Sequence, residues 1–491
     1  MLNWRSADGN SNCDVAVIGA GFSGTLTAVH LVRMSAGTVS VALIEKRERF
    51  ARGVAYATDD PSHLLNVPAG KMGAYAREPE HFLRWCCEHP DCCRAAGVEN
   101  VQAGSFVPRK LYGDYLKDLL EDARRRWPSL RLFQGEVTDL RPKLNGQLVV
   151  EFLGGQTLKA AKVVLALGNF PPGDPKLLDQ RFHTSSRYLT DPWATATTER
   201  LSEPGDILIL GSGLTGLDLL LSLAKCRREG TIHLISRRGL FPQPHASCAP
   251  CPSLLDASTL PKTAREALNQ VRKASRRATE AGSDWRAVID ALRPFTQKIW
   301  RRWDWVERRR FLRHLRAYWE PHRHRASPEA LAIKQYLETR GRLACYRGRV
   351  RSITENAAGL EVEFVEFRRR EPRRLHVSYV VNCTGPECNY HKLKDPLVLQ
   401  LFLRGLITPD PLFLGIDVGA DGIIYNVYGE RVPNLYTLGS PQKGRLLETT
   451  AVPELRVQAE DLATRLWSEL DRPDRARVEA GSDRLAPAYE I

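Results

Sequence analysis

The sequence predicts an α/β fold with two parallel sheets, because a strand, a glycine-rich turn and a helix follow one another at two places. The first such unit has the apolar run Val-Ala-Val-Ile at 15–18 and glycines at 19, 21 and 24. The second has Ile-Leu-Ile-Leu at 207–210 and glycines at 211, 213 and 216. A short apolar run before such a turn is typical of a buried parallel strand. The length of 491 residues favours two or three domains.

The first glycine turn has the spacing Gly-x-Gly-x-x-Gly and is followed by a helical pattern. The first glycine permits a tight turn, the second lets the backbone approach a pyrophosphate, and the third lets helix and strand pack closely. The next strand ends on an acid 21 residues later, where a carboxylate can accept hydrogen bonds from a ribose. An ordinary βαβ turn is the alternative. The predicted FAD contacts here are Gly19, Gly21, Phe22, Ser23, Gly24 and Glu45.

The second glycine turn differs at the end of its second strand. Ser236 stands where the first unit has its acid, and Arg237 and Arg238 follow. An acid would repel a 2′-phosphate, whereas serine and arginine can bind one, so this unit favours NADPH over NADH. Surface charge at a strand end is the alternative for the two arginines. The predicted NADPH contacts are Gly211, Gly213, Leu214, Thr215, Gly216, Ser236, Arg237 and Arg238.

Five further residues are candidate cofactor contacts. Arg109 precedes a predicted helix over 111–126, where a phosphate or carbonyl can be held, and a surface salt bridge is the equal alternative. Gly168 and Gly385 follow apolar strands, as expected where the chain crosses between two nucleotide-binding domains. Gly439 and Ser440 form a turn before a predicted C-terminal helix that closes the FAD sheet.

Residues 51–72 form a long irregular stretch, which a compact domain seldom contains unless it is functional. We expect it to lie over the flavin or the substrate. His63, Asn66 and Lys71 are its candidate polar contacts and the only candidates for a catalytic role. Solvated loop side chains are the equal alternative for each.

The predicted FAD domain is discontinuous, with segments 1–198 and 376–491, and the predicted NADP domain spans 199–375. The NADP domain is predicted to contain a basic helical insert at about 255–330. Residues 261–330 include 18 Lys and Arg but only 8 Asp and Glu, a net excess of ten positive charges. Five of the ten tryptophans lie between 285 and 319. An amphipathic cap with inward aromatics is the favoured interpretation, and nucleic-acid binding is the weaker alternative.

Within the insert, Pro294 and Pro321 are predicted to bracket one helix. Four apolar residues recur there at helical spacing and predict its buried face. These residues are Trp305, Leu312, Leu315 and Trp319.

The eleven cysteines lack the spacing of a disulfide framework or a zinc site, so no metal is expected. Cys248 and Cys251 form a Cys-x-x-Cys pair in a proline-rich loop, where a redox dithiol is the minority interpretation. No apolar run approaches a membrane span and no signal peptide is recognisable, so a cytoplasmic location is expected.

Several motifs together resemble flavoproteins with two dinucleotide-binding domains. The motifs are VIGAGFSG, GVAYATDDPSHLLNVPAGKM, FVPRKLYGDYL, GSGLTGLD, ISRRG, VVNCTGP and LYTLGSPQKGRLLETTAVPELR. Within these flavoproteins the chain most resembles the FAD/NAD(P)-binding proteins of YdhS type, which are related to class B flavin monooxygenases and N-hydroxylases. Two features depart from that pattern: Phe182 and His183 are adjacent without the usual glycine, and Ser440 replaces the usual aspartate after Gly439.

The resemblance implies an NADPH-dependent FAD oxidoreductase, in the first instance a monooxygenase. Reduced flavin would take O₂ to a C4a-(hydro)peroxyflavin and transfer one oxygen to a small nucleophilic amine, sulfide or carbonyl substrate. The first alternative is an NADPH reductase or dithiol oxidoreductase without oxygen transfer. The second is a redox-sensing or nucleic-acid-associated binding protein.

Overall fold

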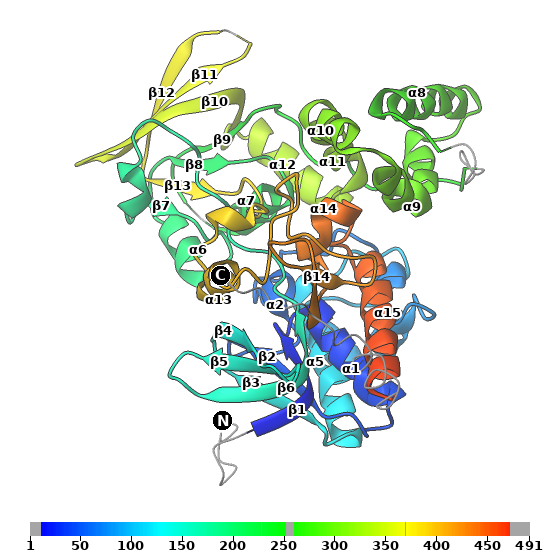
Figure 1. Cartoon of the computed structure of the whole chain (residues 1–491). Coiled ribbons are helices and arrows are strands. Elements are labelled where there is room, and N and C mark those ends of the chain that lie inside the picture. Colours follow the sequence, from blue (N-terminus) through cyan, green and yellow to red (C-terminus); the bar gives the residue numbers. More distant parts are fainter. Residues whose placement is uncertain (1–10, 227, 252–259, 369, 472–491) are drawn as a thin grey trace.

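A computed structural model describes residues 11–226, 228–251, 260–368 and 370–471. Five parts of the predicted domains lie outside the described residues, namely 1–10, 227, 252–259, 369 and 472–491. The described chain forms two separate sheets with helices packed on them (Figure 1), so the predicted α/β class is confirmed.

The first sheet has eight strands, of which β15, β6, β1, β2 and β3 run parallel in that order. Strand β14 pairs antiparallel with β15, and β4 and β5 form hairpins that lead into β6, as the Asn-Gly and Gly-Gly pairs predicted. The strands are β1 (Ser11–Ile18), β2 (Val41–Glu45), β3 (Leu130–Gln134), β4 (Val137–Pro142), β5 (Leu148–Phe152), β6 (Thr157–Leu165), β14 (Ile423–Tyr425) and β15 (Arg431–Thr437).

Three long helices cover one face of the first sheet and share its largest core: α1 (Phe22–Met34), α5 (Arg109–Arg126) and α15 (Val452–Leu470). Helix α1 is central there, with ten of its thirteen residues buried. Short helices α2 (Gly53–Tyr56), α3 (His81–Glu88) and α4 (Pro90–Ala95) join the same side, and α13 (Pro396–Leu403) packs on β4 across the other face.

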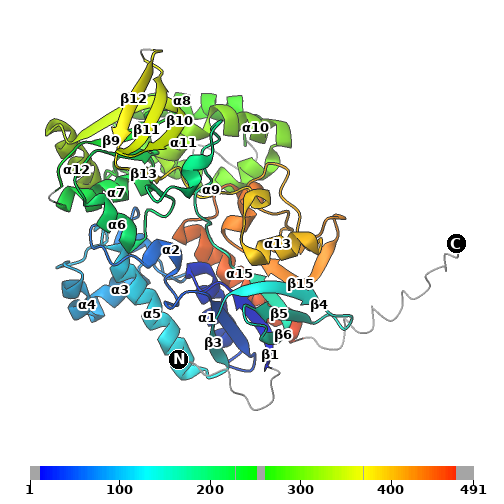
Figure 2. The same cartoon turned by 90° about the vertical axis from the view of Figure 1, so that its left-hand side faces the viewer.

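The second sheet has seven strands in the order β12-β11-β10-β9-β8-β13-β7. Strands β10, β9, β8, β13 and β7 are parallel, and β11 and β12 extend β10 as an antiparallel ribbon that projects from the molecule (Figures 1 and 2). The strands are β7 (Tyr188–Leu189), β8 (Ile207–Leu210), β9 (Ile232–Ser236), β10 (Leu343–Asn356), β11 (Gly359–Glu366), β12 (Pro372–Val377) and β13 (Tyr379–Asn382).

Helices α7 (Leu214–Lys225) and α12 (Pro328–Thr339) share one core with strands of the second sheet, and α6 (Thr195–Leu201) adjoins them. The domain boundaries at 198/199 and 375/376 stay a prediction. Strands β7 and β13 of the second sheet lie just outside the segment 199–375. Every helix in the described ranges is too short or too polar to span a bilayer.

The part of the insert that the structure describes, from residue 260, has the helices α8 (Ala264–Glu280), α9 (Trp285–Arg302), α10 (Trp305–His314) and α11 (Arg316–Arg323), and α12 begins at its end. The prediction of one helix bracketed by prolines is wrong, because Pro294 lies inside α9 and Pro321 inside α11. The Asp304 carboxylate accepts from the Glu307 N–H at 2.8 Å and caps α10, which separates it from α9.

The predicted buried face of the insert is only partly correct. Leu312, Leu315 and Trp319 pack on its core, whereas Trp305 is 59% exposed. Trp305 is the first residue of α10, whereas Trp319 lies in α11. The four residues therefore do not belong to one helix, and their spacing does not define a single buried face. Trp300, which the pattern did not select, is only 1% exposed and belongs to this core together with Trp303.

The packing of α1 on β1 generates a stability prediction. A Cβ atom at Gly24 would stand 1.9 Å from the Gly19 carbonyl oxygen, so Gly24→Ala must displace the helix. We expect the free energy of unfolding to fall by about 2 kcal/mol or more, measured by urea denaturation. Gly104→Ala is the control, because a Cβ there would meet no atom within 4 Å. Equal stability of the two variants would contradict this account.

Candidate functional site

The first glycine turn connects β1 to α1 at the carboxyl end of the first sheet. Gly19 has φ +102°, and a Cβ there would stand 2.3 Å from the Ala166 carbonyl oxygen. The carbonyl oxygen of Gly19 leaves no room for a Cβ atom at Gly24. At Gly21 a Cβ would stand 3.5 Å from the Cα of Gly53, which is ordinary contact. Packing therefore requires the first and third glycines, and the middle one leaves the backbone approachable.

Helices α1 and α7, which follow the two glycine turns, begin without a side-chain cap. Their N-cap residues are Gly21 and Gly213. Other helices have such caps, from Thr263, Asp284, Asp304, Ser327 and Asp395, whereas further helices such as α5 and α15 also begin without one. The first N–H groups of α1 and α7 thus lack a side-chain acceptor, and the phosphates of a dinucleotide would supply one. This fits the cofactors that the sequence predicts.

Glu45 ends β2 beside the first turn, as predicted. Its Oε2 accepts a hydrogen bond from the Ala20 N–H at 3.0 Å and its Oε1 accepts one from the Arg47 N–H at 3.1 Å. The residue is only 8% exposed. Each carboxylate oxygen still has a free lone pair, so the group can hold the turn and accept from a ribose hydroxyl together.

Three distant segments meet next to this turn. Gly439, with φ +76°, lies close to Ser23, because a Cβ at Gly439 would stand 3.4 Å from the Ser23 Oγ. The Ser440 hydroxyl donates to Asn169 Oδ1 at 2.7 Å, next to Gly168 with its φ of +66°. The turn residues predicted from the two ends of the chain are therefore neighbours, and Asn169 joins them.

The neighbouring Phe22 ring is buried and packs on Tyr112, with ring centroids 6.3 Å apart. Phe22 therefore anchors the start of α1 in the core through a side chain that points away from solvent. The Gln458 side chain, on α15, accepts from the Gly439 N–H at 3.0 Å. Sequence reasoning selected neither Asn169 nor Gln458, since single amides carry no motif.

The second glycine turn repeats the geometry of the first. Gly211 has φ +110°, and a Cβ there would stand 2.4 Å from the Cys383 carbonyl oxygen. A Cβ at Gly216 would stand 2.5 Å from the Gly211 carbonyl oxygen. Gly213 is exposed and a Cβ there would meet no atom within 4 Å. Leu214 and Thr215, the first residues of α7, are half-buried beside it.

Ser236 ends β9 beside this second turn. Its Oγ lies 2.9 Å from the Ser212 Oγ and accepts from the Gly239 N–H at 3.0 Å. Arg237 and Arg238 are exposed, and neither forms an ion pair among the described residues. The Arg238 guanidinium lies 5.9 Å from the ring centroid of Tyr318. Two unpaired guanidinium groups and a hydroxyl thus adjoin the start of α7.

Gly385 follows β13 next to the same turn and has φ +92°. A Cβ there would meet no atom within 4 Å, so the glycine serves the backbone conformation. The Thr384 hydroxyl before it donates to Asn382 Oδ1 at 2.7 Å. Strands β6 and β13 therefore end beside the glycine turns of their respective sheets.

His63 and Arg109 both face the second-sheet helix α7. The His63 Nε2 lies 2.8 Å from the Ser222 Oγ, and the Arg109 Nη2 donates to the Asp218 carboxylate at 2.7 Å. The salt-bridge alternative for Arg109 is thus observed, in a buried position between the two domains. Its contact with a cofactor stays a prediction.

Burial acts on the ionisable groups of this contact. It lowers the pKa of His63 from the usual 6.5 to about 4. It also raises the pKa of Asp218 to about 6, although the Arg109 guanidinium opposes the rise. His63 is therefore neutral at pH 7 and cannot serve there as a cation.

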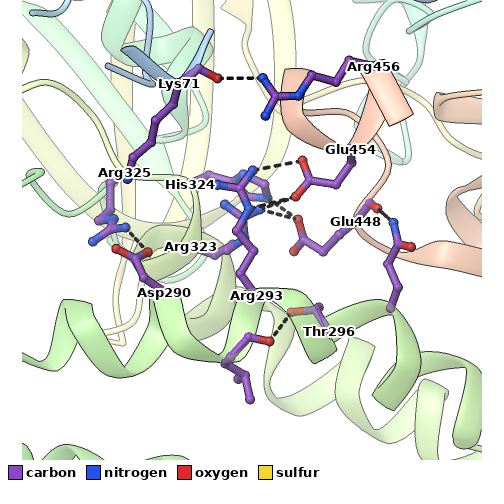
Figure 3. A network of polar contacts seen from close by, with 12 residues as sticks. Lys71, Asp290, Arg293, Thr296, Arg323, His324, Arg325, Glu448, Glu454 and Arg456 are labelled. Atoms are coloured by element: carbon purple, nitrogen blue, oxygen red, sulfur yellow. Dashed lines mark hydrogen bonds and ion pairs between the residues drawn. The ribbon is translucent and has the colours of Figure 1, made fainter. Parts of the chain in front are cut away.

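Asn66 and Lys71 lie away from α7 and have other partners. The Asn66 carbonyl oxygen accepts from His245 Nε2 at 2.9 Å. Lys71 is exposed and its carbonyl oxygen accepts from Arg456 Nη1 at 3.5 Å (Figure 3). The three candidate loop residues thus have separate partners: α7 for His63, His245 for Asn66 and Arg456 of α15 for Lys71.

The insert is fastened to the segment that precedes and begins α15 (Figure 3). The Arg293 Nε and Nη2 donate to the two Glu454 carboxylate oxygens at 2.9 and 3.1 Å. Arg323 contacts Glu454 at 3.2 Å and Glu448 at 3.4 Å, and the Trp319 indole donates to Glu448 at 2.9 Å. These acids neutralise arginines of the basic insert.

Glu448 is held in place by an unusual backbone turn. Its N–H donates to the Leu446 carbonyl at 2.6 Å, and Leu447 between them has φ +58° and ψ −61°. This is the γ-turn geometry that is rare for a bulky residue. Burial, the largest influence, raises the pKa of Glu448, but His324, Arg323 and the Trp319 N–H outweigh it and leave the pKa below its usual value. The carboxylate is therefore ionised inside the interface.

Cys248 and Cys251 are free thiols and both are half-buried. Burial, the largest influence, raises the pKa of the Cys248 thiol, and Asp290 and Asp284 raise it further. A raised pKa lowers the thiolate fraction that dithiol chemistry needs. No group of metal-ligating side chains is found in the described part of the chain.

The neutral state of buried His63 generates a pH prediction. Since its pKa is about 4 in the folded chain and 6.5 when unfolded, protonation favours unfolding, and the stability it contributes is lost as pH falls from 6.5 to 4. Relative to His63→Gln, the wild type should lose up to about 1.4 kcal/mol per pH unit in that range. Urea unfolding at pH 8, 6 and 5 measures this. A difference that is independent of pH would contradict a neutral His63.

Comparison with known proteins agrees with this geometry. Residues 16–170 match the protein family described as FAD-NAD(P)-binding, and no curated protein matches the chain. The chain is similar to an ornithine hydroxylase from Pseudomonas aeruginosa, with a TM-score of 0.64 and 16% identity over 93% of this chain and 99% of that chain. It is also similar to an L-lysine 6-monooxygenase from Pseudomonas syringae, with a TM-score of 0.62 and 18% identity over 92% of this chain and 99% of that chain. A bacillithiol disulfide reductase from Staphylococcus aureus has a TM-score of 0.54 and 12% identity over 94% of this chain and 99% of that chain. At these identities the likeness establishes the fold, that of flavoproteins with two dinucleotide-binding domains, as predicted.

Proposed function

We propose that the protein is an NADPH-dependent FAD oxidoreductase that acts as a monooxygenase on a small nucleophilic substrate. One observation carries the proposal: two glycine turns, each opening a helix without a side-chain cap, lie at the carboxyl ends of two parallel sheets in one chain. The similar structures named for ornithine and lysine hydroxylation support oxygen transfer.

The residues of the first turn would hold FAD. The free N–H groups that begin α1 would bind its pyrophosphate, Glu45 its ribose, and the turn at Gly439 and Ser440 would flank it. Ser440 can accept or donate a hydrogen bond but adds no charge where an aspartate would. When bound, FAD supplies hydride acceptance and the activation of O₂. The chain itself binds, orients and excludes water.

The residues of the second turn would hold NADPH. The N–H groups that begin α7 would bind its pyrophosphate, and Ser236 with Arg237 and Arg238 would bind the 2′-phosphate. Neither arginine has a competing acidic partner in the described ranges, which supports a preference for NADPH over NADH.

A flavin reductase with a Cys248–Cys251 dithiol is the second candidate, and the bacillithiol disulfide reductase fold supports it. The raised pKa of the Cys248 thiol weighs against it. We further propose membership of the YdhS-type proteins and a cytoplasmic location. Binding of nucleic acid is disfavoured, because acids of the C-terminal segment neutralise part of the basic insert.

Anaerobic stopped-flow tests the proposed function. We expect NADPH to reduce the bound flavin at least tenfold faster than NADH does at equal subsaturating concentrations. On mixing with O₂, a transient absorbance distinct from those of reduced and oxidised flavin should follow. Direct reoxidation without a transient would favour the reductase, and a protein purified without flavin would refute the proposal.

Replacing Arg237 with Ala tests the 2′-phosphate site. The Kd of NADPH should rise about tenfold, because a charge-assisted hydrogen bond is lost, while the Kd of NADH stays within twofold. Arg340→Ala is the matched control, because Arg340 is also exposed but precedes the start of β10, at the amino ends of the parallel strands, whereas Arg237 follows the carboxyl end of β9. The assignment fails if both nucleotides weaken equally or if Arg340→Ala has the same effect.

A further inference from the structure

We call the part of the molecule built on each sheet the first-sheet domain and the second-sheet domain. A buried polar contact joins loop 58–65 of the first-sheet domain to helix α7 of the second-sheet domain. It is remote in sequence, because its partners lie more than 100 residues apart. Nothing in the proposed binding of either cofactor uses these side chains. The contributing residues are Thr58, Asp60, His63, Arg109 and Trp193, with Asp218 and Ser222 from α7.

The charged half of the contact is the pair Arg109–Asp218. Their side chains are 12% and 8% exposed, and their N and O atoms are 2.7 Å apart. The Arg109 Nε also donates to the Leu64 carbonyl at 3.0 Å, and its guanidinium lies 5.2 Å from the ring centroid of Trp193. The guanidinium is thus fixed on its own domain and presents one remaining edge to α7.

The other half is a chain of hydrogen bonds that runs through the neutral His63 imidazole and ends on the Asp60 carboxylate. The Thr58 hydroxyl donates to His63 Nδ1 at 2.7 Å, and His63 Nε2 donates to the Ser222 Oγ at 2.8 Å. The Ser222 hydroxyl in turn donates to Asp60 Oδ2 at 2.5 Å. This assignment of protons starts from the Asp60 carboxylate, which can only accept: Ser222 donates to it and therefore accepts from His63 Nε2, which leaves Nδ1 of the neutral imidazole as the acceptor for Thr58. This hydrogen-bond chain depends on the position of α7, because Ser222 of α7 is the link between His63 and Asp60.

Helix α7 is the same helix whose first turn would bind the phosphates of NADPH. Asp218 follows Gly216 by two residues, and Ser222 lies one helical turn further on. A helix of twelve residues transmits a displacement at Ser222 to Gly213. Hydride transfer requires the reacting atoms to be oriented within about 1 Å, so the position of this helix matters to the rate.

We propose that Arg109, Asp218, His63 and Ser222 are positioning residues that fix α7 against the first-sheet domain and thereby set the rate of hydride transfer from NADPH to the flavin. The fixing of α7 against the first-sheet domain is independent of the proposed function, whereas the effect on the rate of hydride transfer rests on it. Arg109 contacts Asp218 and His63 contacts Ser222, so in this proposal they act through the orientation of α7 and its sheet rather than by contact with the reacting atoms.

Two substitutions on α7 test the proposal. Ser222→Ala removes one hydroxyl and interrupts the hydrogen-bond chain between His63 and Asp60. Asp218→Asn keeps the shape of the side chain but removes the charge that pairs with Arg109. Asp139→Asn is the matched control: Asp139 is equally buried and pairs with Arg404 at 2.6 Å, but both residues belong to the first-sheet domain. All variants are purified with their flavin, and rates are expressed per bound flavin.

We expect the limiting rate of anaerobic flavin reduction by NADPH to fall about tenfold in each α7 variant. The Kd of NADPH should change less than threefold, and reduction by dithionite should be unaffected. Amide hydrogen exchange should rise together in loop 58–65 and α7, and small-angle scattering should indicate a wider range of domain arrangements. Asp139→Asn should lower the thermal midpoint and leave the limiting rate unchanged.

Unchanged limiting rates in both α7 variants, or an equal loss in Asp139→Asn, would overturn the positioning role. Unchanged hydrogen exchange and scattering would overturn the domain contact itself. If NADPH and NADH fail to reduce the wild-type flavin, the proposed function and the rate effect both fail, and exchange and scattering alone then decide whether these residues hold the domains.

Discussion

The architecture depends on the close approach of a helix to a strand at two glycine turns. In each unit the third glycine lies against the carbonyl oxygen of the first, and the first lies against the carbonyl of the neighbouring strand. No side chain fits between these backbones. The approach brings the N-terminus of the helix to the carboxyl edge of the sheet, where its unpaired N–H groups remain open to a ligand.

The two halves are joined by contacts of different chemistry. At α7 a buried ion pair and a chain of hydrogen bonds through His63 connect the domains. At the insert, Arg293 and Arg323 meet Glu448 and Glu454, and the Trp300 indole donates to the Gly444 carbonyl at 2.8 Å. Polar groups buried in this way restrict the geometry, since any other arrangement leaves them without partners.

The sequence predicted the parts of this fold that are local. Glycine spacing and apolar strands located both turns, Glu45 and Ser236, because each depends on neighbours within about 25 residues. It did not predict the Asp218 and Ser222 contacts, because partners such as Arg109 and Ser222 lie more than 100 residues apart and carry no motif. The helices around Pro294 and Pro321 were missed because packing on Trp300 and its neighbours outweighs the local preference of proline.

The path of the chain through the first sheet has a consequence for its biosynthesis. Strand β15 pairs with β6, and α15 packs on α1, so residues 431–470 complete a core begun by residues 11–34. The whole second sheet is synthesised in between. The edge of β6 that pairs with β15, with its unpaired backbone groups, and the apolar side of α1 that faces α15 therefore stay uncovered on the ribosome until residues 431–470 emerge. The nascent chain is a natural client for chaperones during that interval.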